Sequence, residues 1–443
     1  MTRIPLESSL SSRVDFESNP QGQITLTGFA QNVRTLSWGA FLILRLPNHL
    51  LQVVVSKDAV PLPDIPVEST VRVTGTLKPA ALKDKALNPS TVELEASRLE
   101  ILSGPVGGPL PLDVSKKELH ADQSTIFDLR PLSLRHPRER AVFRIQSAIF
   151  NEFGNHLTRI GFTRICSPKL VFSGAEGGAN VFKLDYFGRT AYLAQSPQFY
   201  KQMMVGVFGR VFEEAPAFRA EKHNTSRHVN EYISLDFEMQ LDNGFQDIIQ
   251  VEASVLRSIL AHLSEAYASE LSLLEVELPA LQDIVTIEFA EAKELVYRTY
   301  GVDNRGESDL SPEEERRISQ YAKENWNTDF VFLTHYPSSK RPFYAMDDPA
   351  RPDLTLSFDL LFRGMEITTG GQRLHRYQDY LAKMERRGMD PVPFEPYLQT
   401  FRFGMPPHGG LGLGLERFTA KLCGIDNIKA CSLFPRDLDR LTP

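Results

Sequence analysis

Charged residues gather most densely between residues 218 and 238. Both ends of this segment alternate as strands do, so Arg219 and Glu221 are expected on one face of a first strand. Ser234, Asp236 and Glu238 are expected on one face of a second. Because an arginine offers phosphate oxygens a two-pronged fork, the pattern predicts a hairpin that holds a polyanion such as a triphosphate. A solvated hairpin is the alternative interpretation.

Two carboxylates flank a short turn at Arg363-Gly364. If these two residues form the whole turn, Asp359 lies opposite Thr368, and Glu366 is its diagonal neighbour on the same face. Two nearby carboxylates and the hydroxyl of Thr369 would make an oxygen-rich site, which suits Mg²⁺ bound together with phosphates. The alternative is a surface hairpin with two solvated acids.

Glycine is concentrated in residues 408–417, where it would let the backbone approach a ligand closely, just before Arg417 enters a helix. A glycine run alone more often indicates a turn. Two other segments are polar. One places Lys201 a helical turn after Gln198, and the other, residues 173–178, is expected to be a loop that carries a single carboxylate, Glu176.

Composition excludes several classes of protein. The chain has 443 residues, a formal charge of −7, 42% hydrophobic and 24% charged residues, which is ordinary for a folded protein of two or three domains. It has no apolar run long enough to cross a bilayer and no secretory signal, so we expect a cytoplasmic protein. The acidic balance argues against nonspecific coating of DNA, although a local basic patch could still bind nucleic acid.

Common catalytic signatures are missing from the sequence. The three cysteines show no CxxC spacing, no histidine pair has HExxH spacing, and no GxxxxGK[ST] phosphate loop occurs. Zinc and a nucleophilic cysteine are therefore improbable.

The pattern of elements predicts two domains. About five short strands up to residue 104 suit a small barrel, and a Gly/Pro-rich stretch follows them. Beyond it, a helix is expected over 138–160, and Ser311 to Glu314 form a capping box that begins another. Paired strands with helices between them indicate the α+β class with an antiparallel sheet. The expected boundaries are a barrel at 1–104, a linker at 105–135 and a catalytic domain at 136–443.

Three segments, in this order, resemble the signature motifs of class II aminoacyl-tRNA synthetases. Residues 138–168 resemble motif 1, residues 218–231 motif 2 and residues 412–417 motif 3. The resemblance is closest to the aspartyl-tRNA synthetases of the archaeal and eukaryotic type, and it covers nearly the whole chain. The other segments that resemble this family are residues 173–178, 195–202, 370–373 and 433–437.

The resemblance implies an antiparallel-sheet catalytic domain preceded by an all-β OB-fold barrel, with Arg219, Glu366 and Arg417 as catalytic residues. The residues that would bind ATP are Arg219, Glu221, Arg227, His228, Glu366, Gly414 and Arg417. Those that would bind aspartate are Glu176, Gln198, Lys201, Arg219, Asp236, Thr369 and Arg373. Those that would hold Mg²⁺ are Glu366, Thr369 and Asp359, with threonine at position 369 where a serine is common.

The implied reaction is ATP-dependent activation of L-aspartate, followed by transfer of the aspartyl group to the 3′ end of tRNA(Asp), with tRNA(Asn) left open as a second acceptor. In-line attack of a carboxylate on the α-phosphorus needs positioning and cations rather than a protein nucleophile. Lys201 and Arg373 would favour aspartate, because the amide of asparagine would leave both charges unpaired.

In the barrel, the resemblance implies anticodon contacts by Arg34, Phe41 and Gln52, with Phe41 stacking on a base at about 1–3 kcal/mol. The alternative is that Phe41 belongs to the barrel core. Phe29 and Leu46 depart from the family pattern, which usually has tryptophan and aspartate at these positions.

Three other functions compete with this one. The first, asparaginyl-tRNA synthetase, conflicts with Lys201, because an amide has no charge for a lysine to meet. The second, an enzyme like aspartate–ammonia ligase, conflicts with the presence of residues 1–104. The third, an inactive tRNA-binding paralogue, conflicts with the presence of Arg219, Glu366 and Arg417.

The resemblance of residues 138–168 to motif 1 also implies a homodimer.

Overall fold

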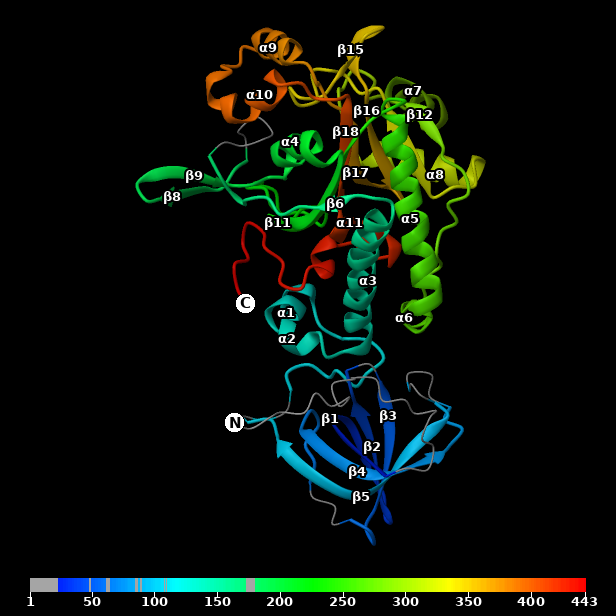
Figure 1. Cartoon of the computed structure of the whole chain (residues 1–443). Coiled ribbons are helices and arrows are strands. Elements are labelled where there is room, and N and C mark those ends of the chain that lie inside the picture. Colours follow the sequence, from blue (N-terminus) through cyan, green and yellow to red (C-terminus); the bar gives the residue numbers. More distant parts are fainter. Residues whose placement is uncertain are drawn as a thin grey trace. The chain divides into compact units, whose positions relative to one another are not determined.

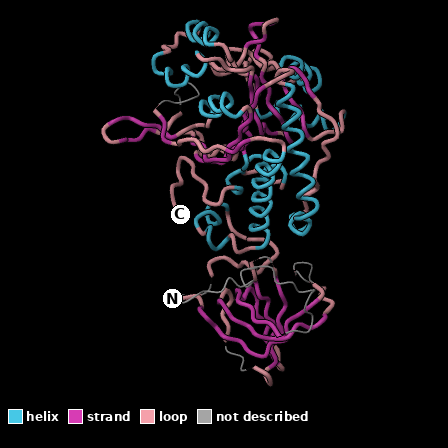
Figure 2. Tube along the Cα trace, viewed as in Figure 1, coloured by secondary structure: helices cyan, strands magenta, loops and turns pink. Residues whose placement is uncertain are grey.

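The computed structural model describes residues 23–47, 49–60, 64–83, 87, 90–106, 108, 110–172 and 180–443. The predicted loop residue Glu176 lies outside the described residues. The chain divides into two compact units, Met1–Pro137 and Arg138–Pro443. Figure 1 shows the elements of each unit and Figure 2 separates its helices from its strands. No helix of the described residues is long and apolar enough to cross a membrane.

The first unit contains a closed barrel in the strand order β1-β2-β3-β5-β4, which is the OB-fold arrangement. Alternation of side chains along these strands buries one face of each strand, and Leu42, Leu51, Val53 and Val73 meet in the centre. The strands are β1 (Gln23–Thr35), β2 (Gly39–Arg45), β3 (Leu50–Ser56), β4 (Thr70–Pro79) and β5 (Val92–Ser103).

A buried carboxylate joins the barrel to the segment that follows it within the first unit. Glu68 accepts hydrogen bonds from Arg45 at 2.5 and 2.6 Å and from Arg135 at 2.9 Å. The two guanidinium groups lie 4.8 and 5.0 Å from the ring centroid of Phe29. Phe29, one of the departures from the family pattern, therefore packs against the two arginines that bind Glu68. The helices of this segment are α1 (Gln123–Asp128) and α2 (Arg130–Ser133).

The second unit is built on an eight-stranded sheet that is antiparallel except for its two outermost pairs, β12–β13 and β10–β6. This confirms the predicted α+β class. In the order of the sheet, the strands are β12 (Thr286–Glu288), β13 (Phe330–Thr334), β16 (Ser357–Phe362), β17 (Met365–Gln372), β18 (His408–Gly414), β11 (Glu231–Gln240), β10 (Arg210–Phe218) and β6 (Thr163–Arg164). Two small sheets contain β7 (Leu170–Val171), β9 (Arg189–Leu193) and β8 (Lys183–Tyr186), and β14 (Asp347–Asp348) and β15 (Arg351–Thr355).

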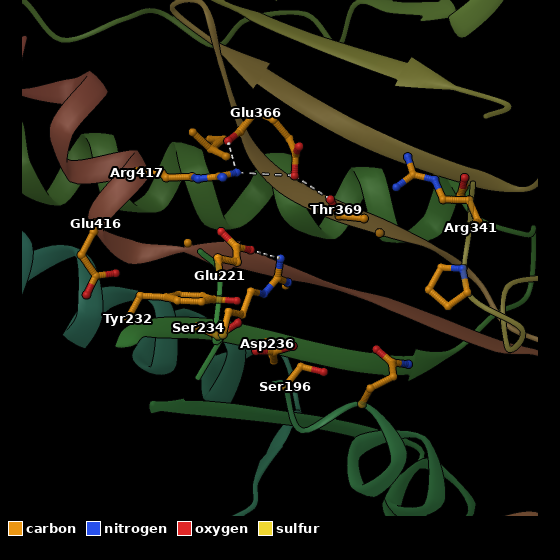
Figure 3. Close-up of a pocket in the computed structure, with 18 of the residues that line it drawn as sticks. Ser196, Glu221, Tyr232, Ser234, Asp236, Arg341, Glu366, Thr369, Glu416 and Arg417 are labelled. Atoms are coloured by element: carbon orange, nitrogen blue, oxygen red, sulfur yellow. Dashed lines mark hydrogen bonds and ion pairs between the residues drawn. The ribbon is translucent and has the colours of Figure 1, made fainter. Parts of the chain in front are cut away.

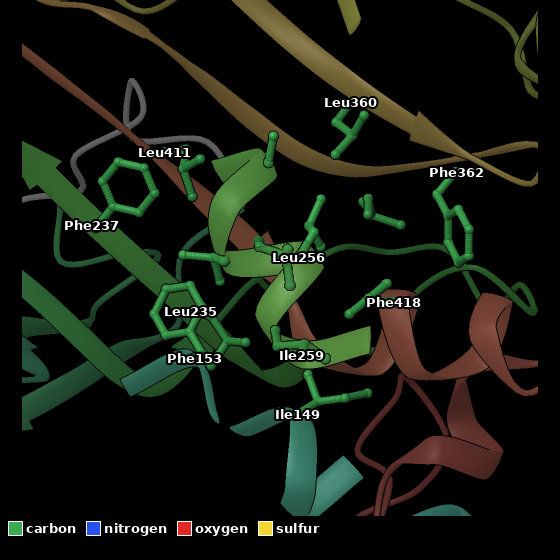
Figure 4. Close-up of a cluster of buried hydrophobic side chains, with 14 of the residues drawn as sticks. Ile149, Phe153, Leu235, Phe237, Leu256, Ile259, Leu360, Phe362, Leu411 and Phe418 are labelled. Atoms are coloured by element: carbon green, nitrogen blue, oxygen red, sulfur yellow. The ribbon is translucent and has the colours of Figure 1, made fainter. Parts of the chain in front are cut away.

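Two long helices cover one face of the large sheet. The helix predicted over 138–160 is observed as α3, and its Ile149 and Phe153 pack with Leu256 and Ile259 of α5 against strand residues such as Leu235 (Figure 4). This leaves the opposite face open for a site. The helices of the unit are α3 (Pro137–Arg159), α4 (Gln198–Phe208), α5 (Gln246–Ala266), α6 (Ala268–Leu274), α7 (Phe289–Tyr300), α8 (Pro312–Asn325), α9 (Tyr377–Arg386), α10 (Glu395–Arg402) and α11 (Leu415–Leu422), with 3₁₀ turns η2 (Val392–Phe394) and η3 (Ile428–Cys431).

The hairpin of β16 and β17 has a different register from the one predicted. The two-residue turn at Arg363-Gly364 is present, but a bulge shifts the pairing between Leu360 and Leu361, so Asp359 lies opposite Thr369 and not opposite Thr368. A bulge adds one residue to one strand and cannot be derived from turn length alone. It places Thr369 beside Glu366, whereas Thr368 is buried.

Close packing against neighbouring strands accounts for some of the glycines in β18. A Cβ atom at Gly410 would lie 2.0 Å from the Phe237 carbonyl oxygen and 2.4 Å from the Glu238 carboxylate. Only glycine allows the backbone to approach its neighbours so closely. Gly412 and Gly414, by contrast, line a cavity.

The first prediction concerns Glu252, a fully buried residue of α5. Burial raises the pKa of its carboxyl to about 8, with Thr368 opposing the shift and Asp359 adding to it. The folded chain therefore keeps a proton that the unfolded chain releases from about pH 4.5 upward, so stability decreases as the pH rises toward 8. Glu252→Gln should remove this slope, which is at most about 1.4 kcal/mol per pH unit.

Urea unfolding of the wild type and the variant at pH 5.5, 6.5 and 7.5 measures the effect. The stability of Glu252→Gln relative to wild type should increase steadily with pH. The matched control is Glu265→Gln on the exposed side of the same helix, which should change nothing. A difference between Glu252→Gln and wild type that stays constant with pH would contradict the prediction.

Candidate active site

A cavity of about 380 Å³ lies in the second unit over the open face of the sheet. Figure 3 shows its lining, with side chains from β11, β17, the start of α11 and the segment between β10 and β11 directed toward one another. The segments that resemble motifs 2 and 3 meet here because β11 and β18 pair directly in the sheet. The predicted site residues that line the cavity are Gln198, Lys201, Arg219, Glu221, Arg227, His228, Asp236, Glu366, Thr369, Arg373, Gly414 and Arg417.

One side of the cavity carries Glu366, Thr369 and Arg417. The Thr369 hydroxyl donates a hydrogen bond of 2.8 Å to the Glu366 carboxylate. Arg417, in the first turn of α11, donates to the Glu366 carbonyl oxygen at 3.1 Å and lies 3.7 Å from its carboxylate. The Glu366 carboxylate and the Thr369 hydroxyl therefore face the cavity together, next to the positive charge of Arg417 (Figure 3).

The segment between β10 and β11, together with the start of β11, supplies a second cluster of charged and aromatic side chains. Arg219 lies 3.9 Å from the Glu221 carboxylate, and its guanidinium lies 5.7 Å from the centre of the Tyr232 ring. His228 lies 3.7 Å from the other Glu221 oxygen. Burial lowers the pKa of His228, Glu221 opposes the shift, and nearby arginines add to it. The imidazole is therefore neutral near pH 7, and the positive charge of this group comes from arginine.

The floor of the cavity contains two buried cations with two buried carboxylates. Lys201 donates hydrogen bonds of 2.8 Å to Asp236 and to the Leu411 carbonyl oxygen, and lies 3.4 Å from Glu238. Arg373 donates to Glu238 at 2.8 Å. Burial by itself would raise the pKa of Glu238, but Arg373 and Lys201 outweigh it and hold that pKa below its usual value. Glu238 is thus ionised, and hydrogen bonds to Asp236 and Glu238 fix the two cations in place.

Gln198 begins α4 and reaches the same floor. Its amide donates a hydrogen bond of 3.0 Å to Gln202, which also accepts one of 3.0 Å from Tyr397. Gln202 is completely buried. Gln198, which lines the cavity, is therefore oriented by the hydrogen bonds of the buried Gln202 behind it.

Asp359, predicted as a metal ligand, lies behind the cavity wall. Its carboxylate is 2.8 Å from the guanidinium of Arg341, which lies over the ring of Tyr336 at 3.9 Å. Burial raises the pKa of Asp359 to about 6, Arg341 opposes the shift, and Glu366 adds to it. The structure places Arg341, rather than Asp359, on the cavity surface.

Sequence analysis missed two residues of this region, Glu315 and Arg341. Alternation predicts Glu238 on the same strand face as Asp236 but assigns it no role. Arg341 follows a lysine and precedes a proline, which indicates no particular role. Glu315 belongs to α8 and bonds to Arg227, 88 positions away in the chain. Contacts over such separations leave no local pattern.

The barrel residues predicted to contact an anticodon share one outer face. Arg34 and Phe41 are direct partners across β1 and β2, and Gln52 follows on β3, where it donates a hydrogen bond of 2.7 Å to Glu93. Phe41 is half-buried and lies outside the barrel core, contrary to the alternative interpretation. Trp38, 45% exposed, contacts its ring edge-on at 5.4 Å.

Known proteins match the chain over almost all of its length. The family model for class II tRNA synthetases (D, K and N) matches residues 122–438. An aspartate–tRNA(Asp/Asn) ligase of Thermus thermophilus is 43% identical over 97% of this chain and 99% of the relative, and one of Deinococcus radiodurans is 43% identical over 96% of each. Among solved structures, asparaginyl-tRNA synthetase of Pyrococcus horikoshii with asparaginyl-adenylate superposes with a TM-score of 0.88 at 29% identity, covering 98% of this chain and 100% of that one. The chain therefore belongs to the class II aminoacyl-tRNA synthetases, in the family of the D, K and N enzymes.

Proposed function

We propose that this chain is an aspartate–tRNA ligase, which activates L-aspartate with ATP and transfers the aspartyl group to the 3′ end of tRNA(Asp). The observation that carries the proposal is the pair of buried cations, Lys201 and Arg373, on the floor of the cavity. The curated relatives named above are aspartate–tRNA ligases. The family fold also serves asparagine, so the choice of substrate has to come from side chains.

The two cations distinguish a carboxylate from an amide. Each already pairs with a protein carboxylate, through Asp236 and Glu238, so each is held in one orientation. A substrate carboxylate adds a further acceptor for their remaining N–H groups, whereas the amide of asparagine would direct two donors at them. A site built for a hydrogen-bonded group rejects an analogue that leaves its buried groups unpaired.

Activation would follow from positioning and charge. Arg219, Arg227 and Arg417 all line the cavity, where they would neutralise the charge that develops on the phosphates in the transition state. The attacking group is the α-carboxylate of the substrate itself. No protein nucleophile is required, and the neutral imidazole of His228 is suited to hydrogen bonding rather than to charge.

The site also fits Mg²⁺ bound with ATP. Mg²⁺ typically takes one or two protein carboxylates and completes its shell with phosphates and water. Glu366 faces the cavity with the Thr369 hydroxyl 2.8 Å from its carboxylate, which makes two oxygen donors. Asp359 is a neighbour of this pair, but Arg341 occupies its carboxylate. When bound, the ion would neutralise part of the charge on the phosphates.

For the barrel we propose anticodon binding by Arg34, Phe41 and Gln52, which share one outer face. The proposed division of labour places the anticodon module at residues 1–104, a linker at 105–135 and catalysis at 136–443. We further propose tRNA(Asn) as a second acceptor, since the relatives at 43% identity are named for both tRNAs. A cytoplasmic location follows from this role in protein synthesis.

Two assays test the proposed function. Pyrophosphate exchange with each amino acid should proceed with aspartate and not with asparagine. Exchange driven by asparagine would indicate the amide enzyme, and no exchange at all would indicate a binding paralogue. Aminoacylation of tRNA(Asp) and tRNA(Asn) transcripts side by side should give aspartyl-tRNA with both, and charging of tRNA(Asp) alone would remove the second acceptor.

The second prediction is that Lys201→Met weakens the use of aspartate far more than that of ATP. The variant loses one charged contact to the substrate side chain, and such a loss in a desolvated site costs roughly 2–5 kcal/mol. Separate KM values for aspartate and ATP in the exchange assay, together with a thermal unfolding curve, measure the effect. Equal increases in both KM values would refute the assigned role.

The third prediction is that Glu366→Gln eliminates adenylate formation and leaves the fold intact. Glutamine preserves the size of the side chain and its contact with Thr369 but removes the charge that attracts Mg²⁺. Exchange activity measured over a range of Mg²⁺ concentrations should stay near background. Near-normal activity of the variant would show that this hairpin has only a structural role.

The fourth prediction is a homodimer of about twice 50.0 kDa. The motif 1 strand β6 forms one edge of the large sheet, and among the described residues it pairs with β10 alone. Shortly after it, Leu170 and Phe172 expose 49% and 56% of their surface. A sheet edge beside exposed apolar side chains suits a twofold interface. Light scattering at micromolar concentration should give the dimer mass, and a fully active monomer would contradict the proposal.

A further inference from the structure

An ion pair at the edge of the cavity has no part in the function described so far. Arg227, in the loop between β10 and β11, donates a hydrogen bond to the carboxylate of Glu315 in α8. The two side chains are only 18% and 10% exposed. Among the described residues, Glu315 is the hydrogen-bonding partner of the Arg227 guanidinium. A partly buried, charge-assisted contact of this kind restricts a long and otherwise mobile side chain.

The same Glu315 oxygen makes a second contact. It accepts the backbone N–H of Glu366 at 3.0 Å. One oxygen therefore connects the loop that carries Arg227 with the strand that carries the proposed Mg²⁺ ligand. Both connected residues line the cavity, whereas Glu315 does not.

Helix α8 gives Glu315 a rigid base. The helix begins with the capping box of Ser311 and Glu314, as the sequence predicts, and Pro312 occupies its first turn. Glu314 is buried and forms an ion pair of 3.2 Å with Lys293 of α7. The position of Glu315 is thus set by the first turn of a helix that is anchored on a second helix.

We propose that Glu315 is a positioning residue for ATP, which holds one edge of the Arg227 guanidinium and leaves its other N–H groups directed toward the phosphates. This inference rests on the proposed function. Arginine carries five N–H donors in a rigid fork, so one edge can be fixed while the others bind a ligand. A side chain ordered before the ligand arrives loses less entropy on binding, which raises affinity.

The opposite role would be competition, in which Glu315 occupies Arg227 until ATP displaces it. Two observations favour positioning. Glu315 lies outside the cavity lining while Arg227 is part of it, so the carboxylate does not stand where a phosphate would bind. Its bond to the Glu366 N–H also keeps the carboxylate in place. The two roles predict changes of opposite sign in ATP affinity.

The fifth prediction, which tests this inference, compares Glu315→Gln with wild type. Glutamine retains an acceptor for the Glu366 N–H but removes the charge that orders Arg227. The dissociation constant of Mg²⁺–ATP, measured by equilibrium dialysis, should increase by about tenfold, as is typical when a supporting partner of a binding residue is removed. The KM for aspartate in pyrophosphate exchange should stay within about twofold, because no contact of Glu315 reaches Lys201 or Arg373.

Glu313→Gln is the matched control. It removes the same charge from the same helical turn, but Glu313 is 48% exposed and pairs with Arg317 on the helix surface. This variant should bind ATP as wild type does. An equal loss in both variants would assign the effect to the charge of the helix and overturn the inference.

A double variant tests whether Glu315 acts through Arg227. In an Arg227→Gln background, adding Glu315→Gln should weaken ATP binding little further, since the group that it orders is gone. Additive losses, unchanged ATP affinity or tighter ATP binding in Glu315→Gln would each overturn the inference. Should Glu315→Gln unfold early in a thermal scan, Glu315→Asp, which keeps the charge but not the reach, should show the same selective loss of ATP affinity.

The experiment separates this inference from the proposed function. Aspartate-dependent exchange by the wild type is measured first, and its absence would refute the aspartate–tRNA ligase assignment. The Mg²⁺–ATP dissociation constants of Glu315→Gln and wild type are measured without any amino acid. Their ratio therefore still decides whether Glu315 positions Arg227.

Discussion

The pairing of two buried cations with two buried carboxylates is the constraint on which the site depends. Lys201, Arg373, Asp236 and Glu238 are all nearly inaccessible to solvent. An ionised group in such a place is costly unless it is paired and hydrogen-bonded, so each of these residues requires the others. The pairing explains how two positive charges remain fixed on the floor of the cavity, which is the basis of the proposed preference for a carboxylate substrate.

The sheet brings these groups together. Strands β16, β17, β18 and β11 all contribute residues to the cavity, and they are consecutive neighbours in the large sheet although their order in the chain differs. Helices α3 and α5 cover the other face with an apolar core, and the polar chemistry is thus confined to one side (Figure 4). Because Gly410 has no side chain, the Glu238 carboxylate can lie directly against the backbone of β18. The cavity therefore combines a rigid floor with loops that carry arginines at its edge.

A second set of residues supports the site from outside. Arg341 holds Asp359, and Glu315 holds both Arg227 and the backbone of Glu366. These partners connect the sheet to helix α8 and to the segment before β14. Such supporting contacts restrict where the side chains that line the cavity can point.

By itself the sequence determined the α+β class, the barrel before it, a helix over 138–160, the capping box at Ser311 and most of the charged residues that meet around the cavity. These follow from local periodicity and from motifs whose residue types suit phosphate and carboxylate chemistry. Only the tertiary structure decided the register at Asp359, because a bulge in β17 changes which side chains face each other without any mark in the turn. It also decided the partners of Arg227, Asp359 and Arg373, since contacts between residues far apart in the chain are set by how the sheet and helices pack.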